Sequence, residues 1–286
     1  MNQVTQSNWK AGIRTTILLA TLTGLLVVLG GLIGGPSTAL LFLGIGLVIN
    51  LASYWFSDKI ALKMSHAQPL AEEEAPRLHQ IVRELAFSAG IPMPRLYMIP
   101  ADQPNAFATG RNPKHSAVAV TRGITELLSE AELRGVLAHE LAHVRNRDIL
   151  TTSVAAAIGG AITWIAYMML WFGGDDDSPF GIVGALAMFL LAPIAATLIQ
   201  LGISRQREFA ADATGARIAG SSNALADALE RLEAGVKAKP MQVNSAAEPL
   251  FIVKPFSGGG VRSLFSTHPP IEERVRRLRA LGVGAQ

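Results

Sequence analysis

Three long stretches of this sequence contain no charged residue. They cover 43 residues from Thr15 to Ser57, 26 residues from Ile149 to Gly174 and 27 residues from Ser178 to Ser204. Because about 20 apolar residues cross the hydrocarbon core of a bilayer as a helix, the second and third stretches each predict one span. The first is long enough for two spans, separated by the turn-forming sequence Gly34-Gly35-Pro36-Ser37.

We therefore predict an integral membrane protein with four transmembrane helices, at about residues 13–33, 38–56, 150–172 and 180–203. A cleaved signal peptide is the alternative for the first helix. However, its apolar stretch exceeds the usual length of roughly 7–15 residues, and a second span follows almost at once. The predicted organisation is an N-terminal segment with a transmembrane hairpin (1–57), a first polar segment (58–149), a second hairpin (150–203) and a second polar segment (204–286).

The basic residues that flank these spans all fall on one side of the predicted membrane: Lys10, Arg14, Lys59, Lys63, Arg145, Arg147, Arg205 and Arg207. The other side carries the turn at 34–37 and the acidic loop Asp175-Asp176-Asp177, without lysine or arginine. By the positive-inside rule, both termini and both polar segments are expected to be cytoplasmic.

Composition excludes several classes of protein. Half of the residues are hydrophobic and 16% are charged, against about 25% in an average soluble domain, which excludes a disordered chain. The chain has no cysteine, so disulfide scaffolds, iron–sulfur clusters and thiolate zinc sites are excluded. A net charge of +3 is too small to indicate a nucleic-acid partner, and we expect none.

The two polar segments carry helix and strand patterns that form one α+β domain with a small sheet if the second hairpin brings them together. We predict helices at 71–87, 205–218 and 223–236, a last basic helix that starts at Pro269-Pro270 and runs through Leu281, strands at 96–99, 106–107 and 116–121, and a loop at 237–262. Ser129 and Glu132 form a capping box that opens a further helix at about residue 130. Since no helix breaker follows, this helix is expected to run straight into the third span.

The sequence His139-Glu140-Leu141-Ala142-His143 is the most informative motif. Two histidines four residues apart lie on one face of a helix and can share one ion, and neutral imidazole suits Zn²⁺. The intervening Glu140 projects beside the metal, where it can accept a proton from water. The alternative is a chance match on a surface helix.

A catalytic zinc site needs a third protein ligand, which must be His, Asp or Glu in a chain without cysteine. Glu208 and Asp212 are again four residues apart on a predicted helix. Glu208 is a candidate ligand, and Asp212 a candidate partner for the outer nitrogen of a ligand histidine. Alternatively, Glu208 pairs with Arg205 in an ordinary basic flank of the membrane.

The chain resembles the HtpX membrane metalloproteases, relatives of the CAAX prenyl proteases, over nearly its whole length. The resemblance rests on the four spans and on the motifs His139–Asp148, Ser204–Asp212, Ser266–Pro270 and Asn105–Gly110. It implies a zincin-like domain with one Zn²⁺ held by His139, His143 and Glu208, with Glu140 as catalytic base and Asp212 behind the ligands. It also implies quality control of membrane proteins in a bacterial cytoplasmic (inner) membrane.

Two further residues are candidates through the same resemblance. His268 and Arg274 match a C-terminal motif that lines the cleft, where either can stabilise the negative oxygen formed when water adds to a peptide carbonyl. Alternatively, Arg274 belongs to a basic face with Arg276, Arg277 and Arg279 that is solvated or contacts lipid. Asp148 either orients a ligand or caps the end of the third span, and we interpret it as structural.

A protease must hold its substrate extended, and adding the substrate as a strand to a sheet edge achieves this through main-chain hydrogen bonds. The strand 116–121 is a candidate for this role, and the alternative is that it is an ordinary core strand. The resemblance places the cleft-facing edge at Asn105, Ala106, Phe107, Ala108 and Thr109. We predict a zinc endopeptidase that contacts the lipid bilayer and cleaves membrane or misfolded proteins on the cytoplasmic side. The alternatives are a metal-binding scaffold without proteolytic activity and a prenyl-peptide protease.

Overall fold

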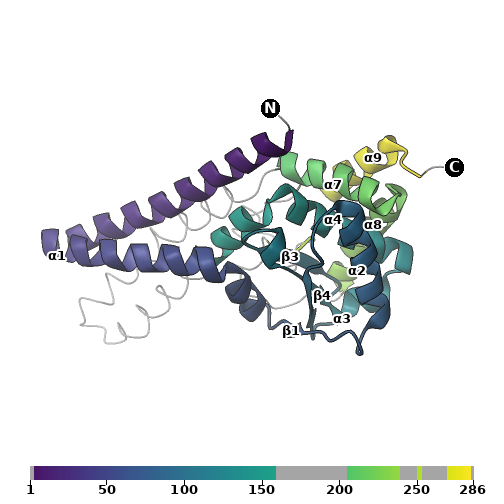
Figure 1. The fold of residues 1–286 in the computed structure, drawn as a ribbon, viewed down its shortest axis with the longest axis horizontal. Coiled ribbons are helices and arrows are strands. Elements are labelled where there is room, and N and C mark those ends of the chain that lie inside the picture. The colour runs from purple at the N-terminus through teal and green to yellow at the C-terminus, as the bar shows by residue number, and fades with distance from the viewer. Residues whose placement is uncertain (1–2, 159–204, 239–249, 253–268, 285–286) are drawn as a thin grey trace.

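The computed structural model describes residues 3–158, 205–238, 250–252 and 269–284 (Figure 1). Most of the predicted third span, all of the fourth, the acidic loop between them and most of the predicted loop at 237–262 lie outside the described residues. His268 lies outside them as well.

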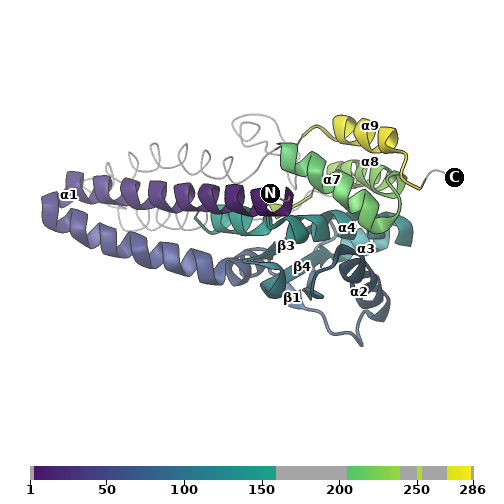
Figure 2. The same cartoon turned by 45° about the horizontal axis from the view of Figure 1, so that its top comes forward.

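The N-terminal helix α1 (Gln3–Met64) consists of two helical arms joined at a sharp turn. Gly34 and Gly35 depart from helical geometry, and Gly35 has a φ of +72°, a region that favours glycine. The side-chain amide of Asn50 on the second arm donates to the carbonyl of Leu19 on the first at 3.0 Å. The arms therefore run side by side (Figures 1 and 2), and the predicted turn is confirmed.

The second arm continues past residue 56, where the sequence analysis ended the predicted span. Ala61 and Leu62 are buried in one apolar cluster with Ile99 and Phe107 of the sheet. This tertiary packing extends the helix through polar sequence to Met64, which apolar length alone does not predict.

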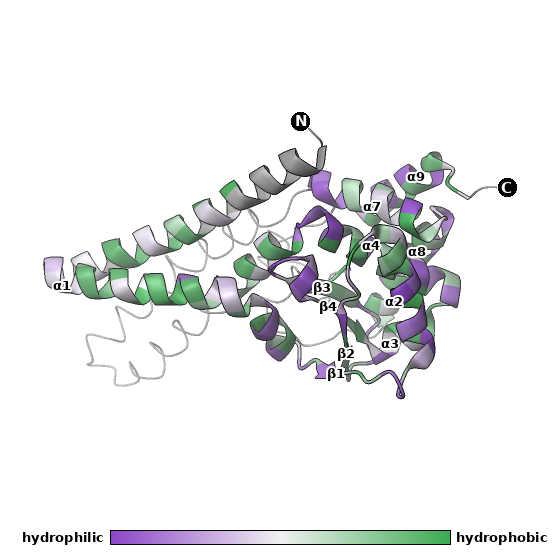
Figure 3. Cartoon of the chain, viewed as in Figure 1, coloured by the Kyte–Doolittle hydropathy of each residue, from purple (hydrophilic) through white to green (hydrophobic). Residues whose placement is uncertain are grey.

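Among the described residues, one helix is long and apolar enough to cross a membrane: the 31 residues Gly34–Met64. Only 11% of its most apolar window is buried, unlike the core helix of a soluble protein. Figure 3 shows apolar residues along both arms of α1, while polar residues gather on the rest of the molecule. Thr15–Val28 and Ile149–Ile158 are shorter apolar helices, so three of the four predicted spans remain predictions.

The polar segments contain a four-stranded sheet in the order β1-β2-β4-β3. Its strands are β1 (Gln68–Pro69), β2 (Arg95–Ile99), β3 (Ala106–Gly110) and β4 (Ser116–Thr121). β2 runs parallel to β4, whereas β3 is antiparallel to β4 with Ala108 opposite Val118. β1 and β3 are thus the two edge strands, β4 lies inside the sheet, and every residue of β3 and β4 is buried.

Helices cover this sheet in layers (Figure 2). The described helices besides α1 and 149–158 are α2 (Pro76–Ala89), η1 (Pro113–His115), α3 (Arg122–Leu127), α4 (Glu130–Asn146), α7 (Arg205–Ala219), α8 (Asn223–Ala238) and α9 (Ile271–Leu281). α4 is central, since it contacts β3 and α2 on one side and α7 and α8 on the other. The two polar segments therefore form one folded body, and the predicted helices and strands are present with small shifts of their ends.

The central helix α4 begins as predicted and ends earlier than predicted. The capping box of Ser129 and Glu132 is present in full. At the other end, Arg147 adopts a left-handed conformation with a φ of +60° and stops the helix after Asn146. A separate helix starts at Ile149, so the expectation of one helix running into the third span is wrong. A left-handed arginine is uncommon, and the sequence carries no glycine to signal the break.

Candidate metal centre

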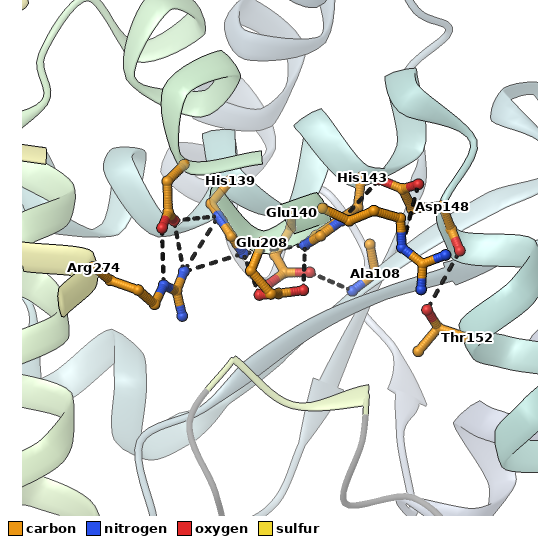
Figure 4. Close-up of polar contacts among 10 residues, drawn as sticks. Ala108, His139, Glu140, His143, Asp148, Thr152, Glu208 and Arg274 are labelled. Carbon is orange, nitrogen blue, oxygen red and sulfur yellow. Dashed lines mark hydrogen bonds and ion pairs between the residues drawn. The ribbon is translucent and has the colours of Figure 1, made fainter. Parts of the chain in front are cut away.

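α4 presents His139 and His143 on one buried face, one turn apart. Their Nε2 atoms lie 3.2 Å from each other. His139 is almost completely buried, while the side chain of His143 keeps 15% of its surface exposed. The two rings face a shared point beside Glu208 (Figure 4), and the remaining exposure of His143 leaves this point accessible from one side.

Glu208 of α7 completes a three-residue group with the two histidines. Its carboxylate oxygens lie 3.7 Å from Nε2 of His139 and 3.5 Å from Nε2 of His143. One ligand atom from each residue falls within 4.8 Å of the others. Two nitrogens bound to one tetrahedral zinc at 2.0–2.1 Å lie about 3.3 Å apart, so the observed spacing of nitrogens and oxygens fits this ion.

Each imidazole directs its other nitrogen, Nδ1, at an aspartate. Nδ1 of His139 lies 2.9 Å from Oδ1 of Asp212, and Nδ1 of His143 lies 3.4 Å from Oδ2 of Asp148. These contacts satisfy a proton on Nδ1 of each ring, so Nε2 is the atom that each histidine offers to a metal beside Glu208.

Arg274 of α9 pairs with Asp212 and also lies next to the ring of His139. Its Nε donates to Oδ2 of Asp212 at 2.9 Å and its Nη2 donates to Oδ1 at 2.7 Å, the bidentate pairing typical of arginine. Its Nη2 also lies 3.4 Å from the ring of His139. The side chain is fully buried, so it does not belong to a solvated or lipid-facing face. Burial would lower the pKa of Arg274, but the Asp212 carboxylate outweighs this and raises it.

The charges around the site set the protonation of its groups. Burial lowers the pKa of His139, and the positive charge of Arg274 adds to this. Burial would also lower the pKa of His143, but Glu208 and Asp148 outweigh it and raise that pKa to about 9. Burial would raise the pKa of Asp212, yet Arg274 and His139 hold it well below its usual range. The carboxylates of Glu208, Asp148 and Asp212 thus favour positive charge around the histidine pair.

Glu140 points from α4 toward the sheet edge. Its Oε2 accepts a hydrogen bond of 2.8 Å from the backbone N–H of Ala108 in β3. Burial raises the pKa of Glu140 to about 7, although His143 opposes the shift. The carboxyl group is therefore held between the histidine pair and the edge strand, at the border of a cleft.

An open cleft joins the metal-binding face to the sheet edge. It is lined by Ala108, His139, Glu140, His143, Asp148, Ile149, Thr152, Arg207, Glu208, Leu250 and Ile252. The edge itself has internal partners, because the N–H of Ile252 donates to the carbonyl of Ala106 at 3.1 Å. Phe251 packs edge-to-face on Phe107, with ring centroids 5.2 Å apart.

The structure thus brings together His139, Glu140, His143, Glu208, Asp212 and Arg274, whereas only Ala108 of the predicted substrate edge 105–109 lines the cleft. Sequence reasoning missed the cleft-lining role of Arg207, which was interpreted only as a membrane-flanking charge, and that of Leu250 and Ile252, which fell in a predicted loop. It also interpreted Asp148 as structural, whereas its carboxylate contacts His143 and lines the cleft. A basic flank does not reveal which arginine turns inward.

A buried HExxH helix with a glutamate from a second helix defines the metallopeptidase type of site. Comparison with known families agrees: residues 72–281 match the model of peptidase family M48. The chain belongs to this family.

Similar proteins narrow this class and confirm the resemblance to the HtpX proteases. The chain is 55% identical over 278 residues to a "Protease HtpX homolog" of Pelotomaculum thermopropionicum, covering 95% of this chain and 99% of that one. It is 52% identical to a protein of the same name from Syntrophobacter fumaroxidans, covering 94% and 98%. Among solved structures, S. mikatae Ste24p matches in fold with a TM-score of 0.50 and 18% identity, over 96% of this chain and 67% of that one.

Proposed function

We propose that this protein is a zinc-dependent endopeptidase of the bacterial cytoplasmic (inner) membrane, with its active site on the cytoplasmic side. One observation carries the proposal: Nε2 of His139, Nε2 of His143 and the carboxylate of Glu208 converge beside Glu140, at the wall of an open cleft. Three protein ligands and an accessible position are the mark of a catalytic rather than a structural zinc site.

His139, His143 and Glu208 would hold one zinc ion. When bound, zinc lowers the pKa of water and polarises a peptide carbonyl. Glu140 then acts as general base, because its carboxylate accepts the proton of the attacking water and returns it to the leaving amine. The hydrogen bond from Ala108 fixes this carboxylate on the side of the cleft where the substrate lies.

Arg274 is proposed to stabilise the negative oxygen of the reaction. Its Nε and Nη2 donate hydrogen bonds to Asp212. Its third nitrogen, Nη1, is buried and has no hydrogen-bond partner among the described residues. A buried donor of this kind costs free energy unless it meets an acceptor. His268, for which the resemblance implies the same role, remains a proposal.

The substrate is proposed to bind as an extended strand along β3, over residues 105–109. Support comes from the position of β3 at the edge of the sheet, directly beside Glu140. The segment Leu250–Ile252 already takes one main-chain hydrogen bond at Ala106. A substrate that pairs along this whole edge must displace that bond, and it must also compete with Glu140 for the N–H of Ala108 and with Ser153 for the N–H of Gly110.

Membrane or misfolded proteins are the proposed substrates, because the edge strand lies next to the apolar arm of α1. Arg111, which follows β3, lies over the ring of Trp55 at 4.7 Å and donates to its carbonyl at 3.3 Å. Tyr54, Trp55 and Phe56 are exposed, as aromatic residues at the level of lipid headgroups are. The cleft would therefore open close to the membrane surface.

The decisive experiment compares the purified full chain with its Glu140→Gln variant. This substitution leaves the three ligands intact, so we expect both proteins to bind one zinc ion per chain. The wild type should hydrolyse casein with zinc and stop with chelator, while the variant should lose about 10²–10⁴-fold in rate. Cleavage by the variant at the wild-type rate would refute Glu140 as the base, and zinc binding without any cleavage by the wild type would favour a scaffold.

A further inference from the structure

The two histidines of the site have matched surroundings, and the proposed function leaves those of His143 without a role. Behind His139 stand Asp212 and Arg274. Behind His143 stands a second carboxylate with a second guanidinium: Oδ1 of Asp148 lies 3.7 Å from Nε of Arg207. The contacts of this second set are longer than the 2.9 Å and 2.7 Å of the first.

We propose that Asp148 and Arg207 are positioning residues for His143, equivalent to Asp212 and Arg274 for His139. Asp148 accepts the hydrogen bond of Nδ1–H of His143, which fixes the tautomer whose Nε2 is free to bind metal, and Arg207 holds the Asp148 carboxylate in place. The inference rests on the proposed function, because it assigns these residues to the same metal centre. Carboxylates that accept from the outer nitrogen of a ligand histidine orient the ring and make it a better ligand.

The backbone explains how the carboxylate of Asp148 contacts the ring of His143, although Asp148 lies five positions further along the chain and beyond the end of α4. The left-handed turn at Arg147 reverses the chain after α4, and the N–H of Asp148 donates to the carbonyl of His143 at 3.0 Å. The carbonyl of Asp148 accepts a hydrogen bond of 3.3 Å from the N–H of Thr152, which begins the helix that starts at Ile149. Both carboxylate oxygens of Asp148 thus contact side chains of the site, Oδ2 at His143 and Oδ1 at Arg207.

Burial strengthens these contacts. The side chain of Asp148 is 7% exposed and that of Arg207 is 14% exposed, although Arg207 directly follows a predicted membrane span. Its neighbour Arg205 is exposed, as a simple flanking charge should be. Arg207 and Glu208 are consecutive on α7, so one helix supplies both a ligand for the metal and the group that holds the partner of another ligand.

The test is the zinc affinity of the detergent-solubilised full chain, measured by competition with a chromophoric chelator. Asp148→Asn preserves the shape of the side chain and removes its charge, and we expect it to weaken zinc binding about 10-fold, within the 10–100-fold range for such partners. Asp212→Asn should weaken binding at least as much, since its contacts are shorter. Asp58→Asn is the matched control, because it removes a partly buried carboxylate that pairs with Arg95 at 2.6 Å, outside the site.

Two further measurements separate positioning from a merely structural role. With Co²⁺ in place of zinc, Asp148→Asn should shift the visible absorption bands of the metal, whereas Asp58→Asn should not. Arg207→Met should weaken zinc binding in the same direction as Asp148→Asn, and Arg205→Met should leave it unchanged; this pair also decides the matter if Asp148→Asn does not fold.

Wild-type zinc affinity and an unchanged Co²⁺ spectrum in Asp148→Asn, with a lower melting temperature of the metal-free protein, would overturn the inference and leave Asp148 a structural residue. Absence of metal binding by the wild type would instead refute the proposed function, and this inference with it.

Discussion

Gly215 of α7 lies directly against the backbone of His139 in α4. A Cβ atom at Gly215 would come within 2.8 Å of Cα of His139 and 2.9 Å of its N. Glu208, Asp212 and Gly215 follow each other at helical spacing on one face of α7. The glycine therefore sets how closely this face, with its two carboxylates, approaches the histidine pair.

Replacing Gly215 by alanine is expected to move α7 away from α4, because the new methyl group meets backbone that cannot rotate aside. Overpacking of this kind costs about 1–3 kcal/mol of stability. Zinc affinity should fall as well, since Glu208 retreats with its helix; calorimetric or chelator titration measures this. Gly24→Ala is the control, because a Cβ there meets nothing within 4 Å. An unchanged zinc affinity in Gly215→Ala would show that the helix spacing does not set the site.

The grouping of the candidate ligands could be predicted from the sequence, whereas part of the construction of the site could not. Residues at i, i+4 spacing lie on one helix face whatever the tertiary structure, so local periodicity placed His139 with His143 and Glu208 with Asp212. Spacing alone left open whether Glu208 pairs with Arg205, and the resemblance to the HtpX proteases was needed to select Glu208 as a candidate ligand. The position of Asp148 depends on a left-handed arginine at 147. No residue preference signals that turn, so its carboxylate was interpreted as structural.

The same distinction applies to the fold. Strands β2 and β4 and helices α7, α8 and α9 were predicted from short-range patterns, and the structure has them. The end of α1 at Met64 was missed because its last turns are fixed by packing on the sheet. Patterning also did not indicate that the three residues Leu250–Ile252, within a predicted loop, would lie on the edge strand.

If zinc is the metal, as proposed, its removal should destabilise the folded protein, because the ligands form a site in the native structure and not in the unfolded chain. At a free concentration of 100 times the dissociation constant, zinc adds about 2.7 kcal/mol of stability. We expect the melting temperature of the purified protein to rise on zinc addition and to return to its starting value with chelator. Glu208→Ala should abolish this rise. A zinc-induced rise that survives in Glu208→Ala would exclude this glutamate as a ligand.

Arg274 should contribute far more to stability than another arginine of the same helix. Arg274→Met leaves Asp212 as a buried carboxylate without its bidentate partner, which costs about 3–5 kcal/mol. Arg279 also pairs with an aspartate, Asp227 at 2.6 Å, but its side chain is 41% exposed. Arg279→Met should therefore cost no more than about 1 kcal/mol. Thermal unfolding of the two metal-free variants provides the comparison, and equal losses would contradict the placement of Arg274.

The contact between Ile252 and the edge strand predicts an effect on substrate affinity. Ile252→Pro removes the N–H that donates to Ala106, so an extended peptide no longer competes with this bond for β3. We expect the KM for such a peptide to fall several-fold with kcat unchanged, since Glu140 and the metal ligands are untouched. Ile252→Val keeps both the N–H and the apolar contact and should behave as the wild type. A higher KM in Ile252→Pro would mean that Leu250–Ile252 forms part of the wall that binds the substrate, because its loss would then remove contacts instead of freeing the edge.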